Sequence, residues 1–492
     1  MQAAGGDLDF TFGDRGLVNT DFNSGDELKA LAVQPDGKII AVGFGTGNFA
    51  LARYNTDSTP DFSFGSGGKV DIRFLNTLTE ANAVALQPDG KIVVAGRIFN
   101  DATGNDFVVA RYNPDGSLDS TFGPNGAAIA DFGGLPEIAT SVAIQPDGKI
   151  VVAGFSLARF ALARFNPDGS LDTTFGSGGK VVTNFFGSGQ SIHAIAIDSN
   201  SRIVVAGRVN NPNTLTSTDF AVARYRSDGS LDPSFGSGGL VTTDFFGRED
   251  FAFSMMIQPD ERIVLAGYAE NLFERKDFAL ARYNRNGSLD TTFGSAGKVS
   301  SDLFKNVDGR FGSTDLGFAA AIQFDGKIIV AGKTINEGIA FESRFALARY
   351  NSEGSLDTTF GSGGIIATSL SGLFQDAQAI AIQDDGKIVV GGQTFTGNAN
   401  RGRDFALLRY FSSTPKIISA TVSGKKLLIS GEDFGEKAVI IINGIEQKTS
   451  NDGQSPATRL IGKKAGKKIK AGDRIQIRNR DRALSPEFIF LG

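Results

Sequence analysis

The sequence has no cysteine, no tryptophan and a single histidine, His193. Without cysteine, a disulfide framework and thiolate chemistry are excluded. Zinc sites that use several His or Cys ligands are excluded for the same reason. A Ser-His-Asp site would have to use His193, yet no G-x-S-x-G motif accompanies it. The sequence therefore gives little support for nucleophilic or zinc-dependent catalysis.

The chain also lacks a strong basic charge and a long apolar run. Its 49 Lys and Arg residues are balanced by 54 Asp and Glu residues, for a net charge of −5. This charge gives no reason to expect a nucleic-acid partner. No apolar run approaches the roughly 18–20 residues that a transmembrane helix needs. The first residues, Met1–Gly6, show neither the basic nor the apolar region of a signal peptide.

Glycine and phenylalanine are abundant, with 63 and 41 copies, and one unit recurs seven times. The stretch NPDGSLDTTFG (Asn166–Gly176) ends in a Phe-Gly pair with counterparts along the chain, at Phe12, Phe64, Phe122, Phe175, Phe235, Phe293 and Phe360. Successive copies lie 52 to 67 residues apart. A period of this length, filled with short strands, predicts a propeller or a solenoid.

Each unit predicts four strands. In the third copy, SVAIQ (Ser141–Gln145) and KIVVAG (Lys149–Gly154) are short, apolar and rich in β-branched residues, and they flank a PDG turn. FALARFN (Phe160–Asn166) and GKVVTNF (Gly179–Phe185) alternate as packed strands do. No window shows a convincing 3.6-residue period. We therefore expect an all-β fold in which helix is scarce.

The two ends of the repeat region complement each other. The N-terminus opens with a corner and a fourth strand near Leu17–Phe22, whereas the seventh copy stops after its third strand at Tyr410. Pairing of these ends would close a ring and remove exposed sheet edges. The sequence therefore predicts a seven-bladed β-propeller of four-stranded blades over residues 7–411, closed by the N-terminal strand.

The repeat resembles a known family. The pattern QPDGKIVVAG…DFALARYNPDGSLDTTFGSGGKV, in seven copies over residues 8–411, resembles the bacterial delta-60 β-propeller repeat and is more distantly similar to the NHL repeat. The resemblance implies that the strand before each PDG turn is the innermost one. Proteins of the delta-60 kind are mostly large, exported or surface-attached, and without assigned activity. The first residues fit either a cytoplasmic protein or an exported one whose signal peptide lies outside this sequence, and the resemblance favours export.

The C-terminal residues 415–492 differ from the repeats. They are similar to an IPT/TIG immunoglobulin-like domain through Pro415, LLISGEDFG (Leu427–Gly435) and AVIIING (Ala438–Gly444), which implies a β-sandwich. The segment holds 15 Lys and Arg residues against 8 Asp and Glu residues, so a basic module follows an acidic ring. A solvated lysine-rich face explains this charge, and the Lys-rich stretch Gly462–Gly472 alone is weak support for binding of an anionic polymer.

The NPDGSLDTTFG corner has two interpretations. A calcium loop of the EF-hand type needs D-x-[DN]-x-[DN]-G and a distant Glu, and the corner offers too few carboxylates. Calcium therefore stays the alternative, and no other cofactor or metal is predicted. In the structural interpretation, in-phase Asp and Arg residues form ion pairs or caps that fasten neighbouring blades. The aspartates are Asp9, Asp61, Asp119, Asp172, Asp232, Asp290 and Asp357, and the arginines are Arg53, Arg111, Arg164, Arg224, Arg282, Arg349 and Arg409.

The connections between strands differ in regularity. The turn between strands one and two has three or four residues in every copy, whereas the two–three and four–one connections vary in length. In an up-and-down blade the two variable connections lie at the same end, so one face is uniform and the other is irregular. Function tends to lie on irregular loops held by a rigid scaffold. We therefore expect a ligand site on the irregular face, at the mouth of the central channel.

One strand-one position makes this expectation concrete, because its residue differs between most copies: Lys29, Asn82, Thr140, His193, Phe253, Phe318 and Gln378. Acidic residues just upstream would make the rim negative, and these are Asp26, Glu80, Glu137, Asp250 and Asp315. The twelve residues form the candidate ligand-binding set. Drift at an exposed strand end would produce the same variation.

Three functional classes remain. The first is a non-catalytic, exported or cell-surface scaffold, monomeric, that binds a glycan or a protein on the irregular face. The second is a carbohydrate-active hydrolase or lyase that uses the rim acids, with His193, Lys29 or Tyr268 assisting. The third is a purely structural surface or adhesin segment. A hydrolase predicts two carboxylates roughly 5–9.5 Å apart in a pocket, at least one of them with a perturbed pKa. We favour the scaffold.

Overall fold

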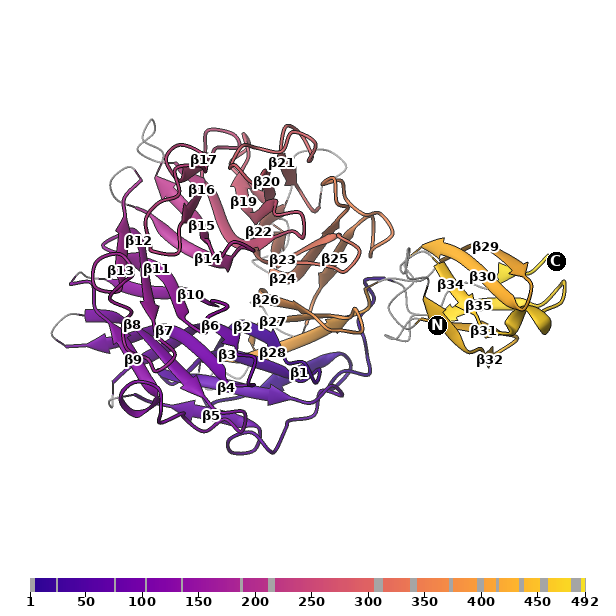
Figure 1. Cartoon of the computed structure of the whole chain (residues 1–492), viewed down its shortest axis with the longest axis horizontal. Coiled ribbons are helices and arrows are strands. Elements are labelled where there is room, and N and C mark those ends of the chain that lie inside the picture. Colours follow the sequence, from indigo (N-terminus) through magenta and orange to yellow (C-terminus); the bar gives the residue numbers. More distant parts are fainter. Residues whose placement is uncertain are drawn as a thin grey trace.

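The computed structural model describes residues 5–23, 25–74, 77–101, 104–133, 136–185, 189–210, 217–304, 313–336, 343–370, 375–395, 402–412, 416–432, 438–451, 459–478 and 488–491. Its sheets are nine antiparallel sheets of four strands each, and seven of them form a ring (Figure 1). In these ranges the helical segments are two short 3-10 turns, η1 (Pro124–Gly126) and η2 (Ala465–Lys467). The all-β prediction is confirmed. No helix of the described part is long and apolar enough to cross a membrane.

Each blade runs from its first strand beside the central channel to its fourth strand at the outside. Blade 1 consists of β2 (Glu27–Val33), β3 (Ile39–Gly45), β4 (Asn48–Tyr54) and β5 (Lys69–Ile72). Blade 2 consists of β6 (Thr79–Leu86), β7 (Ile92–Asn100), β8 (Gly104–Tyr112) and β9 (Ala127–Ala130). Blade 3 consists of β10 (Glu137–Ile144), β11 (Ile150–Ser156), β12 (Arg159–Phe165) and β13 (Lys180–Thr183).

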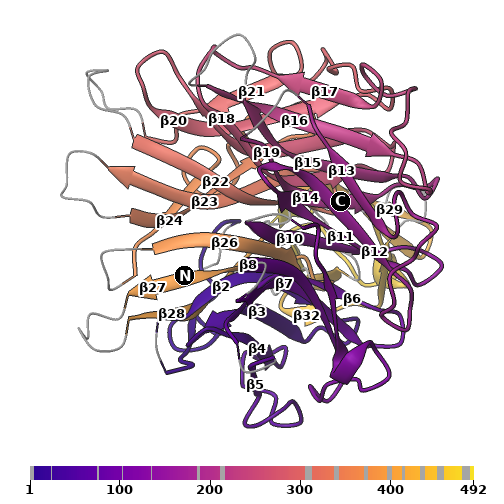
Figure 2. The same cartoon turned by 90° about the vertical axis from the view of Figure 1, so that its left-hand side faces the viewer.

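The next three blades repeat this order. Blade 4 consists of β14 (Ser191–Ile197), β15 (Ile203–Asn210), β16 (Thr218–Tyr225) and β17 (Leu240–Thr243). Blade 5 consists of β18 (Asp250–Ile257), β19 (Ile263–Glu270), β20 (Lys276–Tyr283) and β21 (Lys298–Ser301). Blade 6 consists of β22 (Ser313–Ile322), β23 (Ile328–Asn336), β24 (Ser343–Tyr350) and β25 (Ile365–Thr368). The strand connections lie at the two ends of each blade, and Figure 2 shows the ring from its side.

Blade 7 combines the two ends of the repeat region, as predicted. Its first three strands are β26 (Gln375–Ile382), β27 (Ile388–Phe395) and β28 (Arg403–Tyr410), and β1 (Leu17–Thr20) is its fourth. The register pairs Leu17 with Leu408 and Thr20 with Phe405. The residues before β1 add further contacts that close the ring. Gly6 N–H donates to the Phe411 carbonyl at 2.7 Å, and Gly361 N–H donates to the Gly5 carbonyl at 2.9 Å. The ring thus has no free blade edge at this junction.

A close backbone approach explains the glycine that ends each VVAG segment. Every first strand contains a β-bulge opposite this glycine. At Gly267, a Cβ atom would lie 1.8 Å from the Phe251 carbonyl oxygen across the strand pair. Any larger side chain would collide with the backbone there. The recurring glycine is therefore required by the bulge.

The apolar core of the ring lies between neighbouring blades. One cluster joins Val204, Phe220 and Phe235 of the blade 4 repeat to Leu265 and Ala279 of blade 5. Equivalent clusters lie along the rest of the ring, and the Phe of every Phe-Gly corner is fully buried. Because each core is shared by two blades, the blades stabilise one another.

The tail forms two further sheets, which lie outside the ring (Figure 1). One contains β29 (Lys416–Ser423), β30 (Lys426–Glu432), β34 (Arg459–Gly462) and β33 (Thr449–Asn451). The other contains β32 (Ile445–Glu446), β31 (Val439–Ile442), β35 (Arg474–Arg478) and β36 (Phe488–Ile489). Their buried side chains, among them Leu427 and Ile475, share one core. Pro415 and residues 433–435, on which the IPT/TIG resemblance also depends, lie outside the described residues.

Candidate functional site

The varied strand-one position is the bulge residue of every blade. The ladder shifts register between Leu28 and Ala30 in blade 1 and between Ala252 and Ser254 in blade 5. The other blades shift at the corresponding place. A bulge residue stands outside the regular ladder, and its side chain is re-aimed. All seven bulge side chains are half-buried on the strands that line the channel.

Two of the seven bulge residues join neighbouring blades. Asn82 Nδ2 donates to the Ala139 carbonyl at 2.9 Å, and the Thr140 hydroxyl donates to the Ile192 carbonyl at 2.7 Å. Lys29 instead forms an ion pair with Glu27 at 2.7 Å, in its own strand. These contacts give the bulge residues of blades 1 to 3 structural roles.

The bulge residues of blades 4, 5 and 6 meet in an aromatic cluster, here called the aromatic arc: His193, Phe251, Phe253, Tyr268 and Phe318. The His193 and Phe253 ring centroids are 4.9 Å apart, and Phe253 packs edge-on against Phe318 at 5.3 Å. Phe251 stacks on Phe253 at 5.1 Å and on Tyr268 at 5.4 Å. The structure thus brings together three of the seven predicted positions, from three consecutive blades.

Charged and polar groups border the aromatic arc. The Arg208 guanidinium lies 3.9 Å from the Phe251 ring centroid, and the Lys276 ammonium lies 4.6 Å from that of Tyr268. Ser191 Oγ is 2.9 Å from His193 Nε2. Burial, together with the positive charge of Arg208, lowers the pKa of His193 to about 4. The imidazole is therefore neutral at pH 7 and can accept or donate a hydrogen bond.

Sequence reasoning did not select Phe251, Arg208 or Lys276. Arg208 and Tyr268 occupy the position that directly follows the VVAG glycine, where the copies carry Phe44, Arg97, Phe155, Arg208, Tyr268, Lys333 and Gln393. This second varied position lies on strand two, opposite the start of strand one. A comparison of the copies at that position would have found it.

The predicted negative rim is wrong for four of its five acids. Asp26, Glu137, Asp250 and Asp315 have no exposed surface. Each turns back and accepts the N–H of a residue that follows the preceding fourth strand, as Asp250 Oδ2 does from Phe245 at 2.7 Å. The fifth acid, Glu80, is half-buried and pairs with Arg97. The acids therefore hold the four–one connections in place.

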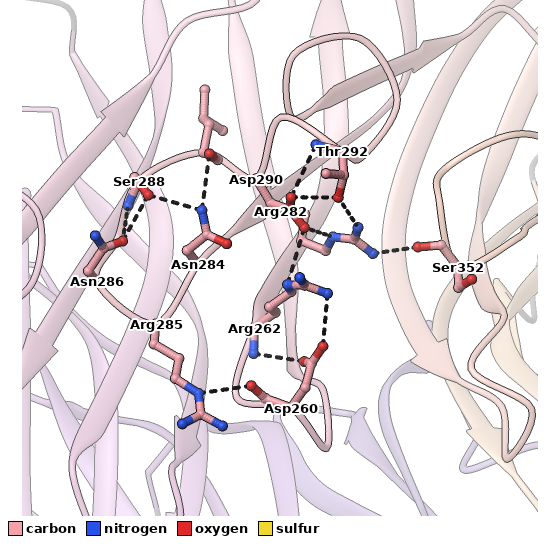
Figure 3. Close-up of polar contacts among 11 residues, drawn as sticks. Asp260, Arg262, Arg282, Asn284, Arg285, Asn286, Ser288, Asp290, Thr292 and Ser352 are labelled. Atoms are coloured by element: carbon pink, nitrogen blue, oxygen red, sulfur yellow. Dashed lines mark hydrogen bonds and ion pairs between the residues drawn. The ribbon is translucent and has the colours of Figure 1, made fainter.

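The recurring Arg and Asp residues form a contact that we call the corner clasp, shown for blade 5 in Figure 3. Arg282 Nε lies 2.8 Å from Asp290 Oδ2, and its Nη1 donates to the Ser352 carbonyl of blade 6. Asp290 Oδ1 accepts the N–H and the hydroxyl of Thr292. The guanidinium also lies 4.5 Å from the Phe293 ring centroid.

The clasp is present in all seven copies, with closest Arg–Asp distances of 2.7–2.8 Å. The expected ion pairs exist, but each forms within one blade. The arginine, not the pair, reaches the next blade, through a backbone carbonyl. In the third copy, Asp172 accepts from Thr174 and Arg164 and pairs with Lys149 at 3.0 Å. Protein donors thus supply this carboxylate's contacts, which favours the structural interpretation of the corner.

At three of the described blade junctions, a hollow lies between neighbouring clasps, on the face of the PDG turns. Their volumes are about 540 Å³ between blades 7 and 1, 480 Å³ between blades 3 and 4, and 620 Å³ between blades 4 and 5. The third is lined by Arg202, Pro259 and Arg285 among others. The sequence did not predict these hollows.

A family model described as a domain of unknown function (DUF5122) beta-propeller matches the chain once per repeat, at residues 34–64, 87–122, 145–175, 199–235, 258–293, 323–360 and 383–413. A search of curated proteins found no match.

Solved structures are similar to the chain at low identity. They include a fungal alcohol oxidase of the AA5 family in complex with copper (13% identity, TM-score 0.43, 96% of this chain and 98% of that one). Others are virginiamycin B lyase from Staphylococcus aureus (10%, 0.43, 80% and 99%) and the β-propeller domain of the trilobed protease from Pyrococcus furiosus (13%, 0.39, 78% and 96%). These scores carry no argument about activity. Residues 5–412, in the part that the structure describes, form a seven-bladed β-propeller whose repeats each match the DUF5122 beta-propeller model.

Proposed function

We propose that the protein is a non-catalytic, exported or cell-surface binding scaffold whose ligand contacts the aromatic arc. The observation that carries this proposal is the gathering of His193, Phe253 and Phe318 at positions that the fold leaves free to vary. Each belongs to a different blade, and each side chain is half-buried. The bulge lies near the start of strand one, which is the end that the irregular four–one connection enters.

The chemistry of the arc favours a glycan over a protein as the ligand. Aromatic faces give large contact areas at a small cost in side-chain entropy. Arg208, Lys276 and Ser191 border the rings with hydrogen-bond donors and acceptors. Sugar rings combine apolar C–H faces with hydroxyl groups, and they match such a mixed surface.

The tail is proposed to be an adaptor of the IPT/TIG immunoglobulin-like type. Its two sheets share a core of their own, which supports an independent module. The protein is proposed to act as a monomer.

The hydrolase alternative has one observation in its favour. Burial, with added repulsion from Asp244 and Asp219, raises the pKa of Asp250 to about 8. However, Asp250 has no exposed surface, and its cluster partners offer oxygens within 4.8 Å, closer than the roughly 5–9.5 Å that glycosidase carboxylates span. The scaffold accounts better for the arc.

The test is a glycan and polysaccharide array run beside product analysis of the same mixtures. We expect binding without turnover, weakened at least about tenfold in Phe253→Ala, because an aromatic anchor contributes over 1.4 kcal/mol at a binding hot spot. Lys29→Ala is the matched control, since it changes the bulge residue of blade 1, which does not adjoin blades 4 to 6. Turnover would contradict a non-catalytic role. Equal binding by Phe253→Ala and wild type would contradict the site.

A further inference from the structure

Among the residues that the structure describes, three blade junctions each contain a cluster of three carboxylates. Asp219, Asp244 and Asp250 meet between blades 4 and 5, and each offers an oxygen within 4.8 Å of the others. The equivalent clusters are Asp404, Asp21 and Asp26 between blades 7 and 1, and Asp106, Asp131 and Glu137 between blades 2 and 3. Because the three clusters occupy equivalent positions of the repeat, we expect them to have the same role.

The blade 4–5 cluster draws on three separate elements. Asp219 lies on β16, Asp244 directly follows β17, and Asp250 begins β18. Asp219 and Asp250 are buried, whereas Asp244 is exposed. The cluster therefore joins two blades and is reachable from solvent on the side of Asp244.

One oxygen of the cluster is buried without a hydrogen-bond partner. Asp250 has no exposed surface; its Oδ2 accepts the Phe245 N–H, but its Oδ1 accepts from no group in the described part of the chain. A buried polar atom in this state costs free energy and requires an explanation, such as a bound ion. The oxygen thus belongs to one of the three carboxylates of the cluster.

The blade 3–4 junction shows that the fold does not need these charges. There, Gln190 occupies the position of Asp250, and its Oε1 accepts the Phe185 N–H at 3.0 Å. Its Nε2 donates to Asn184 Oδ1 at 2.7 Å, so a neutral pair satisfies itself. Gln375 caps Leu370 in the same way between blades 6 and 7. An amide thus supplies the structural contact, and the clusters of three carboxylates that the described residues form at three junctions call for a further role.

A lysine accompanies each cluster. Lys298 of blade 5 donates to the backbone carbonyl of Asp244 at 2.9 Å. At the other two clusters, Lys69 donates to the backbone carbonyl of Asp21 and Lys180 to that of Asp131. The remaining four blades carry Ala127, Leu240, Ile365 and Leu17 at this position. When all three carboxylates are ionised, they and the one ammonium leave two negative charges, which a divalent cation would balance.

We propose that Asp219, Asp244 and Asp250 bind a hard divalent cation of the calcium class, and that the two equivalent clusters are sites of the same kind. Calcium takes oxygen ligands at about 2.3–2.6 Å, so its ligands lie within about 5 Å of one another, as these do. Waters on the side of Asp244 would complete the coordination. The cation would link the fourth-strand end of one blade to the first strand of the next. The raised pKa of Asp250 agrees with a carboxylate buried beside other negative charges.

The test is calorimetric titration of the full chain, stripped with EDTA, with CaCl2 and separately with MgCl2. The double variant D244N/D250Q copies the Asn184–Gln190 pair of the blade 3–4 junction. The side chain at position 250 can then still accept the Phe245 N–H. We expect wild type to bind calcium with a higher unfolding temperature, and the variant to bind one ion fewer per chain. Calcium binding to the native state stabilises it by mass action.

Two results would overturn the proposal. One is no calcium binding by the wild-type chain at millimolar concentration, which would show that the carboxylates share protons instead. The other is an unchanged stoichiometry in D244N/D250Q. Should that variant fail to fold, D250N, which preserves the shape of the side chain, is titrated in its place and judged by the same stoichiometry. Neither outcome depends on a glycan ligand, so this inference stands or fails apart from the proposed function.

Discussion

The two ends of the blades follow opposite rules. At the corner clasps, seven copies repeat one set of contacts, with closest Arg–Asp distances of 2.7–2.8 Å throughout. At the bulges, the copies carry Lys, Asn, Thr, His, Phe and Gln, and their contacts differ from blade to blade. The clasp must match a neighbour on both sides, and this requirement keeps it constant. The bulge residue has no ladder partner, and it is free to vary.

The largest expected effect is on a clasp arginine. Arg282→Ala leaves Asp290 and the Ser352 carbonyl without this donor in a buried contact, and removal of one partner of a buried pair costs about 3–5 kcal/mol. Urea unfolding would measure the loss. Arg262→Ala is the matched control, because Arg262 contacts the same Asp290 but its side chain is 39% exposed, and exposed pairs contribute about 0–1 kcal/mol. Equal effects would contradict the structural role of the clasp.

The second effect concerns the glycine opposite a bulge. In Gly267→Ala the new methyl group meets the Phe251 carbonyl at 1.8 Å, so the strand pair must separate. Overpacking of this kind costs about 1–3 kcal/mol. The unfolding midpoint of the variant should fall accordingly, and the aromatic arc should be disturbed because Phe251 belongs to it. An unchanged midpoint would mean that the bulge is not held rigidly.

The third effect is a pH dependence at the clasp of blade 6. Burial alone would raise the pKa of Asp357, but the hydrogen bonds from Thr359 and the charge of Arg349 outweigh it and lower the pKa from 3.8 to about 2. The stability that this carboxylate contributes is complete above its unfolded pKa and is lost as the pH falls from about 4 toward 2.

Asp357→Asn tests this dependence. The difference in unfolding midpoint between wild type and variant should be largest near neutral pH and should narrow below pH 4. Asp14→Asn, at an exposed position, is the control and should track wild type throughout. A difference that stays constant between pH 7 and pH 2 would contradict the account.

The smallest effect distinguishes bulge residues with structural contacts from the others. Asn82→Ala removes one hydrogen bond to the Ala139 carbonyl, and such a bond contributes about 0.5–1.5 kcal/mol. Its unfolding midpoint should fall slightly, and glycan binding should not change. A binding defect in Asn82→Ala would extend the site beyond the arc.

The sequence predicts the ring well because its signals are local and repeated. The PDG turns, the alternating third strands and the unpaired end at Tyr410 each imply a specific contact, and β1 pairs with β28 as expected. Side-chain direction is harder to predict. The acids near the bulge were expected at the rim, but Asp26 and its counterparts turn back toward the preceding connection. Spacing along a strand does not specify such a turn.

The candidate site was predicted in part for the same reason. Variation among copies located His193, Phe253 and Phe318, but their mutual contact depends on rings from three blades meeting across the bulges. Arg208 and Lys276 join them from neighbouring strands. Tertiary packing, which periodicity does not describe, produces these contacts.

The most direct test of the account compares the two ends of the propeller in one affinity measurement. The arc variant Phe253→Ala/Phe318→Ala and the hollow variant Arg285→Ala/Asn286→Ala are titrated with the glycan that binds wild type best on the array. We predict at least a tenfold loss of affinity in the arc variant and wild-type affinity in the hollow variant. Loss in the hollow variant with an unaffected arc variant would contradict the account and place binding among the clasps.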